Sequence, residues 1–173
     1  MSKSFVLSFS AQDKPGIVEH ISQTISENAG NWLESAMSHL AGRFVGIVVV
    51  DVEIGSVQSL SNAVNALASD SLNITFEALH DEAQHTNEYK SLQIELTGHD
   101  RPGIVSEISA MLAKHNANVE DLSTHLESGS MSAEMLFKAD IHVSVKQDSD
   151  LDDLKDAIES IADDLMVDIH LEE

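Results

Sequence analysis

The chain has 173 residues and a formal net charge of −21 at pH 7, because 30 acidic residues outnumber nine Lys and Arg. Such a charge disfavours direct binding to nucleic acid, where Lys and Arg must neutralise phosphates. It either aids solubility only or steers a basic protein partner towards the chain. The absence of Cys excludes disulfides, zinc–thiolate sites and cysteine catalysis. Without a long apolar run or a signal-peptide core, we expect no membrane binding and a cytoplasmic location.

In chain order, the first element is an alternating apolar strand at Phe5–Phe9, followed by the turn Asp13-Lys14-Pro15-Gly16. Apolar residues then recur at helical spacing from Ile17 to Ile25. The stretch Ile47–Val50 is β-branched and too continuously apolar for an edge strand, so it predicts a central one. The further elements expected in this half are strands at 32–39, 44–54 and 73–79 and a helix at 57–67.

The second half repeats the first with a spacing of 87 residues. Asp13–Val18 returns as Asp100–Val105, and the only two prolines of the chain are equivalent. Asn and Gly near the end of the first helix of each half predict a left-handed residue there. The elements expected in the second half are strands at 92–97, 119–126, 135–145 and 166–171 and helices at 104–112 and 151–165.

Each half therefore has the order βαββαβ, which predicts an α+β protein of two ferredoxin-like domains. In each domain an antiparallel sheet carries both helices on one face. The segment between them has no apolar period and is expected to be a linker. The predicted boundaries are a first domain at 1–80, a linker at 81–90 and a second domain at 91–173.

The duplicated Asp-basic-Pro-Gly-Ile turn between strand and helix, with Asn before the second strand, resembles the ACT domain. The resemblance covers almost the whole chain. A free-standing tandem with Asn31–Met37 and Asn118–Thr124 after its first helices is similar to the glycine cleavage system transcriptional repressor family. The resemblance implies a regulator that binds no DNA itself, senses glycine and contacts a DNA-binding activator. The second turn, with Thr97 to Asp100, keeps more of the polar character of the family than the first.

The turn has features that suit a free amino acid. Pro fixes φ near the value needed at the first helical position, and Gly lets a ligand approach the backbone. The helix N-terminus can hold a carboxylate, Asp13 or Asp100 can accept from an ammonium group, and the Asn side chains can add amide contacts. Together with the resemblance, this predicts a ligand-binding set of Asp13, Lys14, Pro15, Gly16, Ile17, Asn31, His99, Asp100, Arg101, Pro102, Gly103, Ile104 and Asn118.

The alternative interpretation is that Asp13 and Asp100 cap the helices and the glycines only permit a tight turn. If Gly103 has a negative φ, Gly103→Val should block the ligand and leave the fold intact. His80 and His85 flank two acidic residues, but their spacing is not that of a zinc site. We expect no metal, no cofactor and no catalytic residue, since no catalytic motif occurs.

The function predicted is that of a non-enzymatic regulator that senses an amino acid, glycine being favoured, and modulates a transcription factor by protein contact. We also expect self-association into a homo-oligomer. The alternative is an oligomerisation or interaction module that senses no ligand.

Overall fold

The computed structural model describes residues 1–79, 89–128, 135–165 and 167–172. The chain divides into two compact units, Met1–Glu82 and Ala83–Glu173, and each is described by itself. Most of the expected linker at 81–90 lies outside the described residues. Its last two positions, Tyr89 and Lys90, already belong to a strand.

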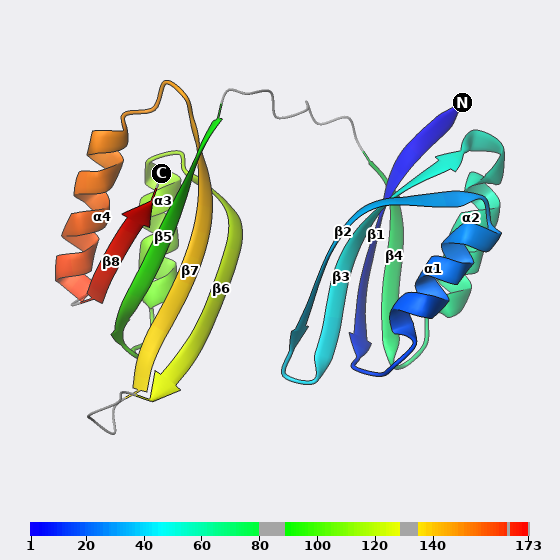
Figure 1. Cartoon of the computed structure of the whole chain (residues 1–173), viewed down its shortest axis with the longest axis horizontal. Helices are drawn as coiled ribbons and strands as arrows, with labels where there is room; N and C mark the ends of the chain where they lie inside the picture. The colour runs from blue at the N-terminus through cyan, green and yellow to red at the C-terminus, as the bar shows by residue number, and fades with distance from the viewer. Residues whose placement is uncertain (80–88, 129–134, 166, 173) are drawn as a thin grey trace. The chain divides into compact units, whose positions relative to one another are not determined.

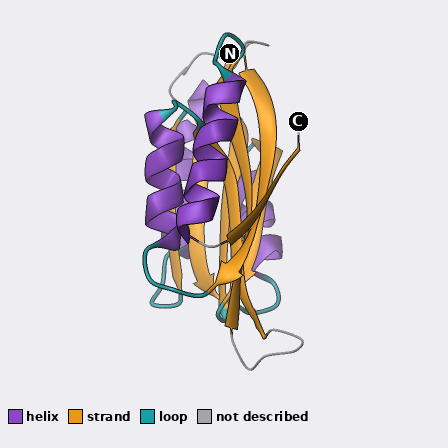
Figure 2. Ribbon diagram, turned by 90° about the vertical axis from the view of Figure 1, so that its left-hand side faces the viewer, coloured by secondary structure: helices purple, strands orange, loops and turns teal. Residues whose placement is uncertain are grey.

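The first unit is one four-stranded antiparallel sheet with two helices packed together on one face (Figures 1 and 2). The strand order is β2-β3-β1-β4. The strand predicted to be central, β3, is central, which confirms that prediction. The elements are β1 (Ser2–Gln12), α1 (Ile17–Glu27), β2 (Gly30–Leu40), β3 (Arg43–Glu53), the short 3₁₀ helix η1 (Ile54–Ser56), α2 (Val57–Leu67) and β4 (Leu72–Ala78).

The second unit repeats this architecture, with the strand order β6-β7-β5-β8. The predicted α+β fold of two ferredoxin-like βαββαβ units is confirmed. The β-bulge of the second strand recurs at the equivalent residue, Leu33 in β2 and Glu120 in β6. The elements are β5 (Tyr89–His99), α3 (Ile104–Lys114), β6 (Asn118–Ser128), β7 (Met135–Lys146), α4 (Leu151–Leu165) and β8 (Val167–Glu172).

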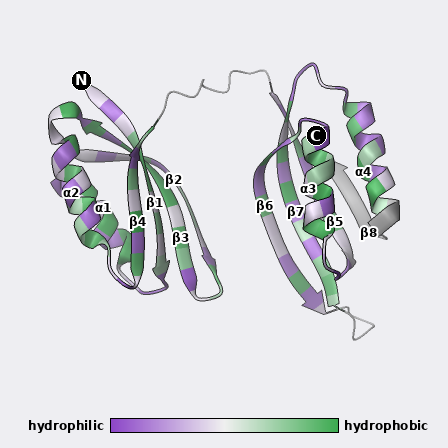
Figure 3. Ribbon diagram, turned by 180° about the vertical axis from the view of Figure 1, so that it is seen from behind, coloured by the Kyte–Doolittle hydropathy of each residue, from purple (hydrophilic) through white to green (hydrophobic). Residues whose placement is uncertain are grey.

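Alternation along the central strands separates a helix-covered face from an open face in each unit. In β1 every second residue from Phe5 to Ala11 is buried, as expected for a strand with period two. Ile21 and Ile25 of α1 close the core of the first unit, and Ile108 and Leu112 of α3 close that of the second. Figure 3 shows the resulting mixture of apolar and polar bands along the elements.

The ends of α1 and α3 differ in part from the prediction. A left-handed residue follows both helices, but in the first unit it is Ala29, at φ 57°, and not an Asn or Gly. Gly30 is instead the first residue of β2. A glycine is needed there because a Cβ would lie 2.8 Å from Cγ2 of Ile25. In the second unit Asn116 takes this conformation, at φ 55°, as the sequence predicts.

Candidate functional site

The first strand of each unit is followed by a glycine-capped helix. Gly16 and Gly103 are the N-cap residues, at φ 95° and 99°, and neither helix has a side-chain cap. The first helical hydrogen bonds run from the N–H of His20 to the carbonyl of Gly16 and from Glu107 to Gly103, both at 2.9 Å. The N–H groups before His20 and Glu107 therefore have no partner within the helix, and the positive end of each helix dipole lies at these turns.

The alternative in which Asp13 and Asp100 cap the helices is wrong. The backbone N–H of Asp13 donates to Gly42 at 3.1 Å, and its carboxylate lies 3.4 Å from Nε2 of His39. Asp100 donates its N–H to Met135 at 3.1 Å. Neither helix has a side-chain cap hydrogen bond, and both Asp residues come three positions before the N-cap glycine.

Two further expectations about the turn are corrected. Pro15 precedes the N-cap and is not at the first helical position, because α1 begins at Ile17. Gly103 has φ +99°, a conformation that L residues with a Cβ rarely adopt. The negative φ on which the proposed Gly103→Val test depended is therefore absent, and that variant would strain the fold itself.

The structure does not bring the Asn residues to the turn. β2 and β6 begin where α1 and α3 end, so Asn31 and Asn118 lie at the far end of an 11-residue helix, about 16 Å away at 1.5 Å per residue. The Asn118 side chain donates to Oε1 of Glu120 at 2.7 Å. His39, at the end of β2, reaches the turn in place of Asn31. The sequence indicated this contact only indirectly, because a strand that follows α1 and runs back alongside it ends near the start of that helix.

A cavity of about 250 Å³ lies beside the turn in the first unit. The β1–α1 turn forms one wall, with Lys14 and Pro15, and His20 stands one turn into α1. The α2–β4 turn forms the other wall, with Ser69 and Ser71. This second wall was not predicted from the sequence, because no motif marks Ser69 or Ser71. Asp13 is not among the lining residues, which are Ala11, Gln12, Lys14, Pro15, Ile17, His20, Leu67, Ser69, Ser71 and Leu72.

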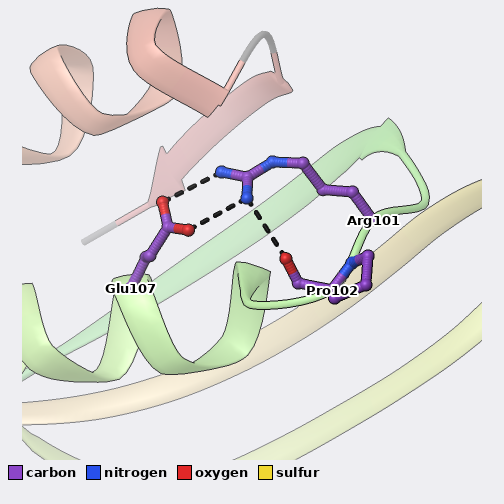
Figure 4. Close-up of polar contacts among 3 residues, drawn as sticks. All are labelled: Arg101, Pro102 and Glu107. Atoms are coloured by element: carbon purple, nitrogen blue, oxygen red, sulfur yellow. Dashed lines mark hydrogen bonds and ion pairs between the residues drawn. The ribbon is translucent and has the colours of Figure 1, made fainter.

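In the second unit the equivalent basic residue is engaged within the chain. The two terminal nitrogens of Arg101 each donate to one carboxylate oxygen of Glu107 at 2.9 Å, and Nη1 also contacts the carbonyl of Pro102 at 3.2 Å (Figure 4). The hydrogen bond with Arg101 lowers the pKa of Glu107 and raises that of the guanidinium. His99 ends β5, and Ile104, the first residue of α3, is buried.

An apolar groove runs between α3 and the edge strand β6. Its wall residues include Val105 from α3, Val119 and Leu122 from β6 and Phe137 from β7. In the first unit the position of Val119 is held by Trp32, whose larger side chain packs against the core. All eleven residues of β6 are exposed. The second unit thus presents an uncovered edge with apolar side chains beside it.

A further cavity, of about 320 Å³, lies on the strands β5, β6 and β7 and is lined by Glu95, Lys138 and Asp140 among others. Two of its charged side chains, Lys138 and Asp140, have partners within the chain. Lys138 forms an ion pair with Glu127, which lowers the pKa of that carboxyl group. Asp140 accepts from Gln93 at 3.2 Å and lies 3.7 Å from His142. This cavity is therefore lined by charges of both signs, which favours no one class of ligand.

Across the described residues, no three His, Asp or Glu side chains gather in a way that could hold a metal ion. His80 and His85 lie outside those residues. No described helix is long and apolar enough to cross a membrane.

The ACT-domain family model matches residues 3–77 and 90–172, so the chain belongs to the ACT-domain family and carries two copies of the domain. This family is regulatory and generally non-enzymatic. The chain is also 60% identical over 30 residues to the UPF0237 protein MK1213 of Methanopyrus kandleri. That match spans 17% of this chain and 33% of the relative, so the chain covers about a third of the curated relative's length.

Two solved structures match the whole chain. A protein of unknown function from Galdieria sulphuraria superposes with a TM-score of 0.86 at 26% identity, over 100% of this chain and 99% of that one. A protein proposed to be a glycine cleavage system transcriptional repressor superposes with a TM-score of 0.72 at 15% identity, over 99% and 97%. The fold of two tandem ACT domains is thus shared with both of these proteins.

Proposed function

We propose that this chain is a non-enzymatic, cytoplasmic regulator that senses a free amino acid and passes the signal by contact with a DNA-binding transcription factor. Glycine is the favoured signal because of the likeness to the glycine cleavage repressor structure. The observation that carries the proposal is the cavity of about 250 Å³ beside the first ACT turn, next to a helix start with unpartnered N–H groups. Such a helix start favours a carboxylate.

The charge of the chain supports a protein partner over direct DNA contact. At −21, the chain would be repelled by phosphates, whereas a basic surface of a DNA-binding protein would be attracted. The uncovered β6 edge is a surface to which such a partner, or a second copy of the chain, can add.

Thermal unfolding against a panel of amino acids tests the sensing half. A ligand that binds only the folded state at 100 times its Kd stabilises that state by about 2.7 kcal/mol, so glycine should raise the melting temperature in a concentration-dependent way. A pull-down of the transcription factor with and without glycine tests the signalling half. Unchanged melting across the panel would refute sensing by the chain alone.

The second candidate is an interaction module without a ligand. The exposed β6 edge and the adjacent apolar groove favour it, because unpaired strand edges are ready sites of association. A stable complex whose affinity does not change on addition of any amino acid would establish this function in place of sensing.

A further inference from the structure

The two ACT units differ at one pair of positions that decides whether the basic residue of the turn is free. At the spacing of 87 residues, Lys14 corresponds to Arg101 and His20 to Glu107. In the second unit the guanidinium of Arg101 holds both oxygens of Glu107 (Figure 4). In the first unit an imidazole replaces this carboxylate, so the same internal ion pair cannot form.

The carboxylate of Glu107 lies over the start of its own helix. Its Oε1 is 3.2 Å from the position that a Cβ of Gly103 would take. It is therefore beside the left-handed N-cap, where the helix dipole favours negative charge. The Glu107 carboxylate therefore takes the position that a bound anion would take between Arg101 and the helix N-terminus.

Among the described residues of the first unit, no carboxylate comes as close to the N-cap glycine as Glu107 does in the second. Lys14 makes no ion pair or side-chain hydrogen bond with any described residue. Glu19 lies in the first turn of α1, but its Oε2 approaches the Cβ position of Gly16 only to 4.0 Å and it does not pair with Lys14. The ammonium group of Lys14 thus borders the cavity without a counter-ion.

The cavity is shaped by backbone hydrogen bonds and is available before a ligand arrives. The N–H of Gln12 donates to Ser71 at 3.0 Å and that of Ser69 donates to Leu72 at 3.0 Å, which fixes the α2–β4 turn against β1. The hydroxyls of Ser69 and Ser71 lie 3.3 Å apart. No acidic side chain lines the cavity; its polar groups are an ammonium, an imidazole, an amide and two hydroxyls.

We propose that the first unit binds a small carboxylate in this cavity, with Lys14 as its counter-ion, and that Glu107 closes the equivalent position of the second unit. This inference rests on the proposed function and assigns its sensing to one unit. It reverses the sequence-based preference for the more polar second turn, because there the basic residue is already neutralised.

The ligand class follows from the groups present. The carboxylate interacts with Lys14, while Asp13, the acceptor expected for the ammonium group, lies beside His39 and outside the cavity lining. Recognition therefore depends on the carboxylate more than on the amine. We expect glycine and acetate to bind and glycinamide, which lacks the carboxylate, to bind at least tenfold more weakly.

The test is a reciprocal exchange in the full chain, measured by calorimetry and by amide NMR shifts with glycine, acetate and glycinamide. The wild type should bind one glycine and shift amides around Lys14, His20 and Ser69. His20→Glu, which brings the second unit's carboxylate into the first, should weaken binding at least tenfold. Glu107→Gln should release Arg101 and raise the stoichiometry from one to two. Glu27→Gln removes one carboxylate at the other end of α1 and should change neither the affinity for glycine nor the stoichiometry.

The outcomes separate this inference from the proposed function. Glycine binding that shifts amides of α3 only, or that survives His20→Glu unchanged, overturns the assignment to the first unit while sensing stands. Binding of acetate without glycine supports the carboxylate site and refutes glycine as the signal. If none of the three compounds binds to the wild type or to Glu107→Gln, the inference fails, and the sensing function fails with it when the whole amino-acid panel also leaves the melting temperature unchanged.

Discussion

The ring of Phe9 in β1 fills the space beside Gly46 in β3, its partner in the antiparallel register. A Cβ on Gly46 would lie 2.6 Å from Cε1 of Phe9 and 2.8 Å from Cγ of Met37. At the equivalent pair of the second unit, Leu96 faces Ala139. Both units place the larger side chain on the first strand, but the first unit pairs a phenylalanine ring with no side chain, whereas the second pairs a smaller leucine with a methyl group.

Gly46→Ala should accordingly destabilise the protein by about 1–3 kcal/mol, the usual result of overpacking a core. The double variant Phe9→Leu/Gly46→Ala reproduces the pair of the second unit and should recover part of this loss. Urea unfolding of the three proteins measures the effect. Gly55→Ala is the matched control, because a Cβ there meets nothing within 4 Å. Equal stability of Gly46→Ala and the wild type would contradict the packing described.

The left-handed residue after α1 gives a second prediction. Ala29 has φ 57°, whereas the second unit places Asn116 at the equivalent position. The left-handed conformation costs an ordinary L residue about 1–2 kcal/mol, and Asn tolerates it better. Ala29→Asn should therefore stabilise the protein by a few tenths to about 1 kcal/mol, and Asn116→Ala should destabilise it similarly. Denaturant midpoints compare the two, and a loss of stability in Ala29→Asn would speak against the geometry.

These helix ends also show which features of the fold can be predicted from sequence patterns and which cannot. Alternation in β1 and helical spacing in α1 predicted the elements, and the run at Ile47–Val50 predicted the central strand, because burial imposes those patterns directly. The choice between Ala29 and Gly30 as the left-handed residue was not predictable. It depends on the contact between Gly30 and Ile25, which arises only when the helix packs on the sheet.

The candidate site was predictable only in part for the same reason. The duplicated motif located the turns before α1 and α3, since glycine at positive φ is a local requirement. The second wall of the cavity, at Ser69 and Ser71, comes from a turn more than 50 residues away. The pairing of Arg101 with Glu107 spans six residues around a helix start, and spacing alone does not distinguish it from two solvated side chains.

The Arg101–Glu107 pair predicts a dependence on pH. The hydrogen bond with Arg101 lowers the pKa of Glu107 below the ordinary value of a glutamate. The pair thus stabilises the fold above the unfolded pKa, and this contribution is lost as the pH falls through the lower, folded pKa. The carboxyl signal of Glu107 should titrate below the ordinary range of a glutamate in NMR, and Arg101→Gln should move its midpoint upward. Because both side chains are partly exposed, high salt should reduce the shift. A midpoint unmoved by Arg101→Gln would exclude the pair in solution.

Self-association through the β6 edge is the last prediction. β6 is eleven residues long, fully exposed and flanked by the groove at Val119 and Leu122, and such edges add strands from another chain. We expect the mass from light scattering to rise with concentration towards a dimer. Leu122→Lys should favour the monomer, because a charge would be buried without a partner at the new interface. Ile54→Lys introduces the same charge at an exposed residue of η1 and should leave the mass unchanged. A dimer that persists in Leu122→Lys would assign the association to another surface, whereas a monomer at all concentrations of the wild type would leave β6 available for the transcription factor.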